Sequence, residues 1–70
     1  MSMMTKIWLA ELYHKEIQMV NVQISDNNRW LLSSQTDEEA EMFTHNIASL
    51  EEYKQTLEEL LKEVMEGQYE

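Results

Sequence analysis

The sequence predicts a small α+β protein in which a short antiparallel β meander precedes an acidic helical segment. Three observations favour this fold class. Apolar and polar residues alternate over residues 17–25, a cluster of Asp and Asn follows them, and apolar residues spaced as in helices occupy the second half. At 70 residues, the chain has the length of one small domain covering residues 1–70.

The strongest strand signal lies in residues 17–25. There, β-branched and polar side chains alternate with the period of a sheet that has one solvated face. The Asx residues at positions 26–28 favour a tight turn, and residues 29–34 can return as a partner strand. These features together predict a β-hairpin.

Residues 5–14 fit two kinds of structure. They can alternate as a strand, but Ile7, Ala10, Tyr13 and residues beyond them also have helical spacing. A helix here would have to continue through the β-branched residues that follow, which favours a strand instead. The predicted meander therefore has strands at residues 5–14, 17–25 and 29–34.

Capping boxes predict the helical segment. Thr36 stands three residues before Glu39, and Ser49 stands three residues before Glu52. Apolar residues then recur at spacings of three and four, and Gly67 suits a C-terminal cap. The prediction is one long helix or two helices at about 37–47 and 50–66. The second box favours two helices or a kink, because one helix of about 45 Å would suit a dimer better than a compact monomer.

The small size of the chain limits its hydrophobic core. A chain of this length buries only about 60% of its unfolded surface, and without cysteine it can form no disulfide. Small chains often gain the missing stability by association, so we expect a homodimer. The apolar stripe expected to form the oligomer interface comprises Leu50, Tyr53, Leu57, Leu60, Leu61 and Val64.

No catalytic signature is present in the sequence. A single Gly excludes a glycine-rich phosphate loop, and the absence of Cys excludes a thiol nucleophile. His14 and His45 belong to no recognisable constellation, and Glu41 with His45 is interpreted as a surface pair on one helix face. We therefore expect no enzyme activity, no cofactor and no metal site.

The sequence also shows no signal peptide and no apolar run near the roughly 18 residues of a membrane span. These observations favour a cytoplasmic protein that does not contact the membrane.

All of the net charge of -9 lies in the second half of the chain. Residues 36–70 contain eleven acidic and two basic side chains, whereas residues 1–35 contain three of each. Such a field repels nucleic acid and attracts basic protein surfaces. Two interpretations stay open. The acidic residues form either a solvated helix face or a functional surface, and a functional surface would explain why the chain tolerates repulsion between neighbouring glutamates.

Glutamates in this half recur every seven residues, about 10.5 Å along a helix. Because DNA carries a phosphate about every 3.4 Å along each strand, two such helices in a dimer could present carboxylates in place of phosphates. The residues expected to bind the partner are Glu51, Glu52, Glu58, Glu59, Glu63 and Glu66, with Asp37, Glu38 and Glu41 as a second patch.

In its character, the chain resembles the small acidic proteins that phages encode to block host factors, including DNA mimics. The residues that carry the resemblance are the acidic run 37–41 and the Glu-rich run 51–70. The resemblance implies a non-enzymatic inhibitor of a basic DNA-binding host protein, such as a nucleoid protein, a nuclease or a polymerase component, in the host cytoplasm. The alternative is a helix-mediated homo- or hetero-oligomerisation module whose glutamates only solubilise it.

Overall fold

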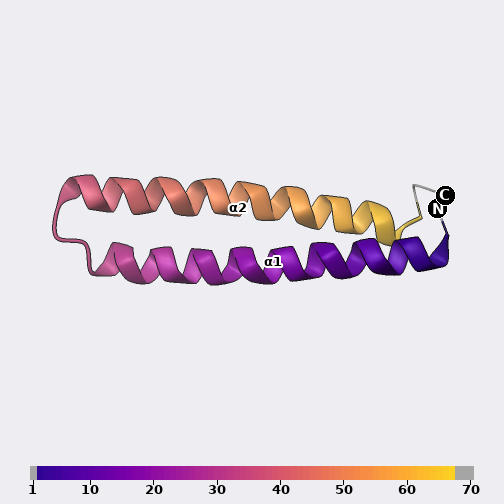
Figure 1. The fold of residues 1–70 in the computed structure, drawn as a ribbon. Coiled ribbons are helices and arrows are strands. Elements are labelled where there is room, and N and C mark those ends of the chain that lie inside the picture. Colours follow the sequence, from indigo (N-terminus) through magenta and orange to yellow (C-terminus); the bar gives the residue numbers. More distant parts are fainter. Residues whose placement is uncertain (1, 68–70) are drawn as a thin grey trace.

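Residues 2–67 form a hairpin of two long antiparallel helices in the computed structural model (Figure 1). Helix α1 comprises Met3–Leu32, helix α2 comprises Asp37–Met65, and residues 33–36 connect them. The start of α1 and the end of α2 lie at the same end of an elongated body, whose Cα atoms extend 51 × 15 × 10 Å.

The predicted α+β fold is wrong, because the described residues contain no strand. The three segments predicted as strands, 5–14, 17–25 and 29–34, fall in α1 and the first two residues of the connection. Their apolar residues serve a helix: Val20 is buried, whereas Val22 is 60% exposed, since residues two apart point in different directions from a helix. Packing against α2 along the whole of α1 outweighs the strand preference of β-branched residues.

On each helix, the residues that face the other helix recur every seven positions. This period is typical of helix pairs that coil around each other with a left-handed twist. Two rows of α1 hold most of its buried or half-buried residues: Ala10, Ile17, Ile24 and Leu31, and Tyr13, Val20 and Asn27. The corresponding rows of α2 are Ala40, Ile47, Lys54 and Leu61, and Phe43, Leu50, Leu57 and Val64. Within the described residues, the buried apolar side chains are Val20, Leu57 and Val64, so the core is thin.

The second of the two predicted alternatives, separate helices at 37–47 and 50–66, is also wrong. Helix α2 continues through Ser49, so the second capping box lies inside a helix. Helix α2 needs no break because α1 has nearly the same length and lies beside it throughout. A compact fold with a β meander would have no partner helix of that length.

Local hydrogen bonds define where the helices begin and end. The hydroxyl of Thr36 accepts from the amide of Glu39 at 3.1 Å, as the first capping box predicts, and the Glu39 carboxylate accepts from the amide of Gln35 at 3.2 Å. At the end of α1, the Ser34 hydroxyl donates to the carbonyl of Leu31 at 2.6 Å. Gly67 follows α2 with a φ of 76°, the left-handed conformation expected of a C-terminal cap.

Candidate functional site

The outer face of α2 carries the acidic surface that the sequence predicts. Glu52, Glu59 and Glu66 are exposed and recur every seven residues, so they form one row. Glu63 lies beside this row and, with Glu59 and Glu66, lines a shallow groove of about 270 Å³. The structure thus brings four of the predicted carboxylates together on one side of α2.

Two basic residues of α2 moderate this surface without neutralising it. The ammonium nitrogen of Lys62 lies 4.0 Å from the Glu66 carboxylate, one turn away, whereas Lys54 belongs to the half-buried inner row. The Gln55 amide donates to Glu59 at 3.4 Å, which holds that carboxylate on the outer side of the helix. An exposed pair such as Lys62 and Glu66 contributes at most about 1 kcal/mol and leaves a strongly negative field.

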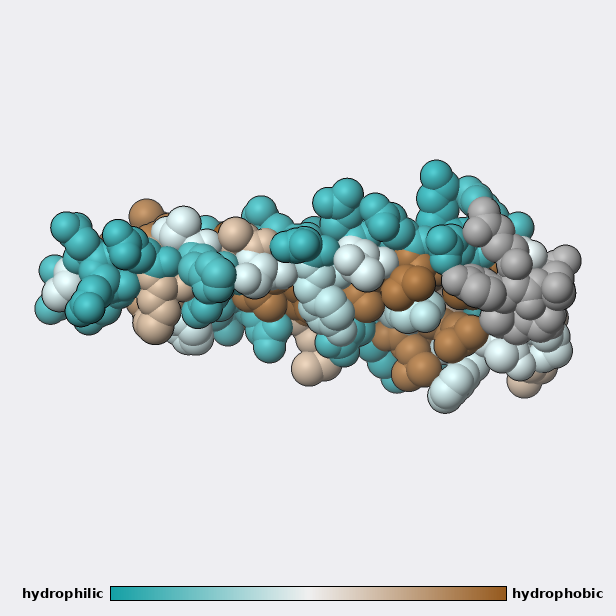
Figure 2. All heavy atoms as spheres, turned by 90° about the horizontal axis from the view of Figure 1, so that it is seen from above, coloured by the Kyte–Doolittle hydropathy of each residue, from teal (hydrophilic) through white to brown (hydrophobic). Residues whose placement is uncertain are grey.

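The other predicted carboxylates do not join this group. Glu51 and Glu58 are exposed on a neighbouring row of α2, closer to the side where α1 lies. Asp37, Glu38 and Glu41 form a separate patch at the connection end, and the ten residues from Glu41 to Glu51 correspond to about 15 Å of helix. Figure 2 shows the molecule from the α2 side, with hydrophilic atoms over the connection end and apolar patches toward the other end.

The predicted oligomer stripe packs against α1 of the same chain. Leu57 and Val64 are buried, and Leu50, Leu60 and Leu61 are half-buried. Tyr53 is the exposed member, and its hydroxyl donates to the carboxylate of Glu16 on α1 at 3.2 Å. For this stripe to bind a second chain, α1 would have to leave it.

Partial burial of Tyr53 raises the pKa of its phenol above the ordinary value of 10.0. The hydrogen bond to Glu16 and the negative charge of that carboxylate raise this pKa further, because both disfavour the phenolate. The bond therefore links the two helices only while Tyr53 keeps its proton.

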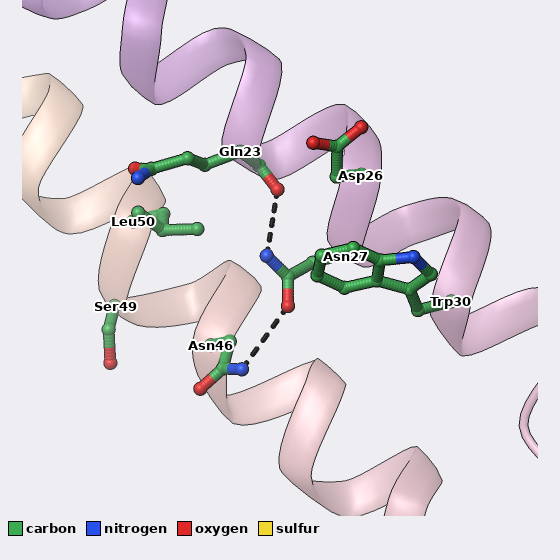
Figure 3. Close-up of a pocket in the computed structure, with 7 residues that line it drawn as sticks. All are labelled: Gln23, Asp26, Asn27, Trp30, Asn46, Ser49 and Leu50. Carbon is green, nitrogen blue, oxygen red and sulfur yellow. Dashed lines mark hydrogen bonds between the residues drawn. The ribbon is translucent and has the colours of Figure 1, made fainter.

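A groove of about 410 Å³ between the helices, with a pair of asparagines in its wall, was not predicted from the sequence (Figure 3). Asn27, 7% exposed, donates from its side-chain nitrogen to the carbonyl of Gln23 at 2.7 Å. Its side-chain oxygen accepts from the amide of Asn46 on α2 at 3.2 Å. Trp30, Ser49 and Leu50 complete the walls with Asp26, whose carboxylate pairs with Arg29.

This amide pair provides a polar contact that joins the two helices at one position. A buried Asn in a seven-residue repeat specifies register, because sliding one helix would leave the side-chain oxygen of Asn27 without its Asn46 partner. The sequence signal was available, since residues 13, 20 and 27 are seven apart, but the Asx cluster was interpreted as a turn.

The structure does not bring the two histidines of the chain together. His14 and His45 are both exposed and lie on different helices. Among residues 2–67, no three His, Asp or Glu side chains come together as a potential metal site. Within the same residues, neither helix combines the length and the hydropathy that a membrane span requires.

Comparison with known proteins adds no relative. The chain matches no family model, and neither a curated protein nor a solved structure matches it.

Proposed function

We propose that this protein binds a basic surface of a DNA-binding protein through the outer face of α2 and thereby competes with DNA. The observation that supports this proposal is the row of exposed carboxylates Glu52, Glu59 and Glu66 on one side of α2, with the half-buried Glu63 beside it. We place this activity in the cytoplasm, and in the host cytoplasm if the chain is phage-encoded.

The physical basis is the placement of like charges at regular intervals along one helix. Lys and Arg side chains that contact phosphates in DNA also form charge-assisted hydrogen bonds with carboxylates. Successive residues of the Glu52 row are about 10.5 Å apart, close to three phosphate steps along one DNA strand. Binding of this kind needs charge and shape but no catalysis.

The test uses the full chain as bait for a bacterial lysate, with duplex DNA as competitor. We expect capture of a basic DNA-binding protein that DNA displaces, and weaker capture as added salt screens the exposed charges. Capture of a protein that DNA does not displace would contradict competition with DNA. Recovery of no protein but the bait would contradict the proposal altogether.

Two matched double variants then locate the binding surface. The change Glu52→Gln with Glu59→Gln removes two charges from the outer row, and Glu38→Gln with Glu41→Gln removes two charges from the patch at the connection end. We expect the first variant to weaken binding of the captured protein at least tenfold, because close charge pairs across an interface contribute about 1.5 kcal/mol or more. The second should change affinity much less, and equal losses in both variants would show that only net charge matters.

A further inference from the structure

Helix α1 has a second apolar stripe on the side turned away from α2. Its members are Trp8, Leu12, Met19 and Val22, spaced at four, seven and three residues. All of them are exposed, and Trp8 and Met19 are each 59% exposed. This outer stripe is about 21 Å long from Trp8 to Val22.

Single exposed apolar residues are common on protein surfaces, but this arrangement differs from scattered ones. The outer stripe also follows a seven-residue pattern: positions 8, 15 and 22 form one row, in which position 15 is Lys15, and positions 12 and 19 form another. A helix that is apolar on two sides normally packs against two neighbours. In the hairpin, α2 supplies one of them.

We propose that a second copy of this chain covers the outer stripe and forms a symmetric dimer through α1. Charge favours a copy of the same chain as the occupant. The first half of the chain, which includes α1, has equal numbers of acidic and basic residues, so two α1 helices can meet without net repulsion. Pairing through α1 also keeps the two acidic α2 helices on far sides, whereas a strongly charged partner would find no complementary field on α1.

The area available fits a small stable dimer. Such interfaces bury about 800 Å² per partner, about one-seventh of the 5393 Å² of surface that the hairpin exposes. One long side of the elongated hairpin can supply an interface of about that area. The thin core gives the association its driving force, because a second chain buries apolar surface that the hairpin leaves in water.

The dimer geometry follows from two-fold symmetry. In an isologous contact between antiparallel α1 helices, residues equally distant from the axis face each other. An axis between residues 13 and 14 sets Trp8 of each copy against Met19 of the other, so the interface gains two sulfur–aromatic contacts. Lys15 then lies near Leu12 of the other copy, where its aliphatic stem covers apolar surface.

The deciding experiment measures molar mass by sedimentation equilibrium over a wide range of protein concentration. We expect the wild-type chain to dimerise and the variant Met19→Glu to raise the dimer dissociation constant at least tenfold. The matched control is Met42→Glu, which places the same charge at a 51% exposed methionine of α2 and should leave dimerisation unchanged. A wild-type chain that stays monomeric at every concentration overturns the proposal, as does a Met19→Glu variant that dimerises like wild type.

A second measurement does not depend on a disruptive variant. Trp30→Phe leaves Trp8 as the sole tryptophan and keeps an aromatic ring near Phe43, whose ring centroid lies 5.8 Å from that of Trp30. Trp8 emission should shift to shorter wavelength with protein concentration, in step with the sedimentation dimer. A Trp8 signal that stays constant while the chain dimerises places the interface elsewhere and overturns the proposal. Both tests are independent of the acidic face of α2.

Discussion

Asn27 is the polar member of an inner row of α1 that otherwise holds Tyr13 and Val20. Its side chain has two partners in the fold, the Gln23 carbonyl in its own helix and the Asn46 amide in the other. A buried amide of this kind lowers the free energy of unfolding relative to an apolar residue of similar size, but it excludes other alignments of the helices. The pair therefore contributes specificity rather than stability.

Replacing both members of this pair by leucine should raise stability and lower structural uniqueness. We expect the double variant Asn27→Leu with Asn46→Leu to gain roughly 1 kcal/mol, a rise in melting temperature of about 4–8 °C. We also expect several oligomeric species in size-exclusion chromatography with light scattering, because the polar contact no longer selects one register. Asn21→Leu, at an exposed position of α1, is the control and should change neither property. A lower melting temperature in the double variant would show that the amides stabilise the hairpin.

At the scale of the elements, α2 could be predicted from sequence and α1 could not. The cap at Thr36 and the three-and-four spacing of apolar residues are local signals, and α2 begins where they indicate. In α1, Val20, Val22 and Ile24 alternate in sequence, but only the fold reveals that Val22 belongs to the outer side. A helix with two apolar sides resembles an alternating strand over a short window, and the distant partner helix decides between them.

Part of the candidate site could likewise be predicted from the sequence, and part of it could not. The outer row of Glu52 and Glu59 could be predicted because a seven-residue spacing on a helix places residues on one side. The separation between this row and the patch at Glu38 and Glu41 depends on the continuity of α2, which the second capping box obscured. The groove at Asn27 depends on the helix pairing itself: the spacing of residues 13, 20 and 27 places Asn27 in a row, but the groove exists only where Asn46 and Leu50 of α2 lie opposite.

The bond between Tyr53 and Glu16 makes the contact between α1 and α2 sensitive to alkaline pH. Because the pKa of Tyr53 is raised in the fold, its contribution to stability is fully present below the unfolded value of 10.0. Above that value the unfolded chain loses the proton first, so the contribution is lost as the pH rises through the raised pKa. Urea unfolding midpoints, measured from neutral pH upward, should therefore fall more steeply for the wild type than for Tyr53→Phe. The control Tyr13→Phe keeps the Tyr53 phenol and should follow the wild type; identical profiles for Tyr53→Phe and the wild type would exclude this linkage.

At the scale of the whole molecule, the dominant property is the unequal charge of the two halves. Residues 36–70 carry the entire net charge of -9, and α2 places several like charges within one or two turns of each other. Such pairs each destabilise a helix by about 0.2–0.5 kcal/mol. The field that attracts a basic partner thus also weakens the free hairpin.

Salt should therefore change stability and partner binding in opposite directions. Sodium chloride shortens the Debye length from about 10 Å at 0.1 M to about 3 Å at 1 M, which screens repulsion along α2 and attraction to a basic partner alike. We expect the melting temperature of the free protein to rise over this range while the affinity for the captured partner falls. The variant Glu52→Gln with Glu59→Gln should show a smaller rise in melting temperature. A melting temperature that falls with sodium chloride would show that ion pairs, not repulsion, dominate the charge balance of the hairpin.

The start of α1 and the end of α2 lie at one end of the hairpin, and this arrangement determines how the helix pair resists mechanical force. Ala10 and Val64, near these ends, line a common groove, whereas Trp30 and Phe43 meet beside the connection. Tension applied between the ends would peel the helices apart one layer at a time, beginning at Val64 and finishing at the aromatic pair. Tension between one of these ends and the connection would instead act along the helices, so all contacts between α1 and α2 would bear the force at the same time. As a tether held by its two ends, the hairpin would open at low force and would close again from the connection.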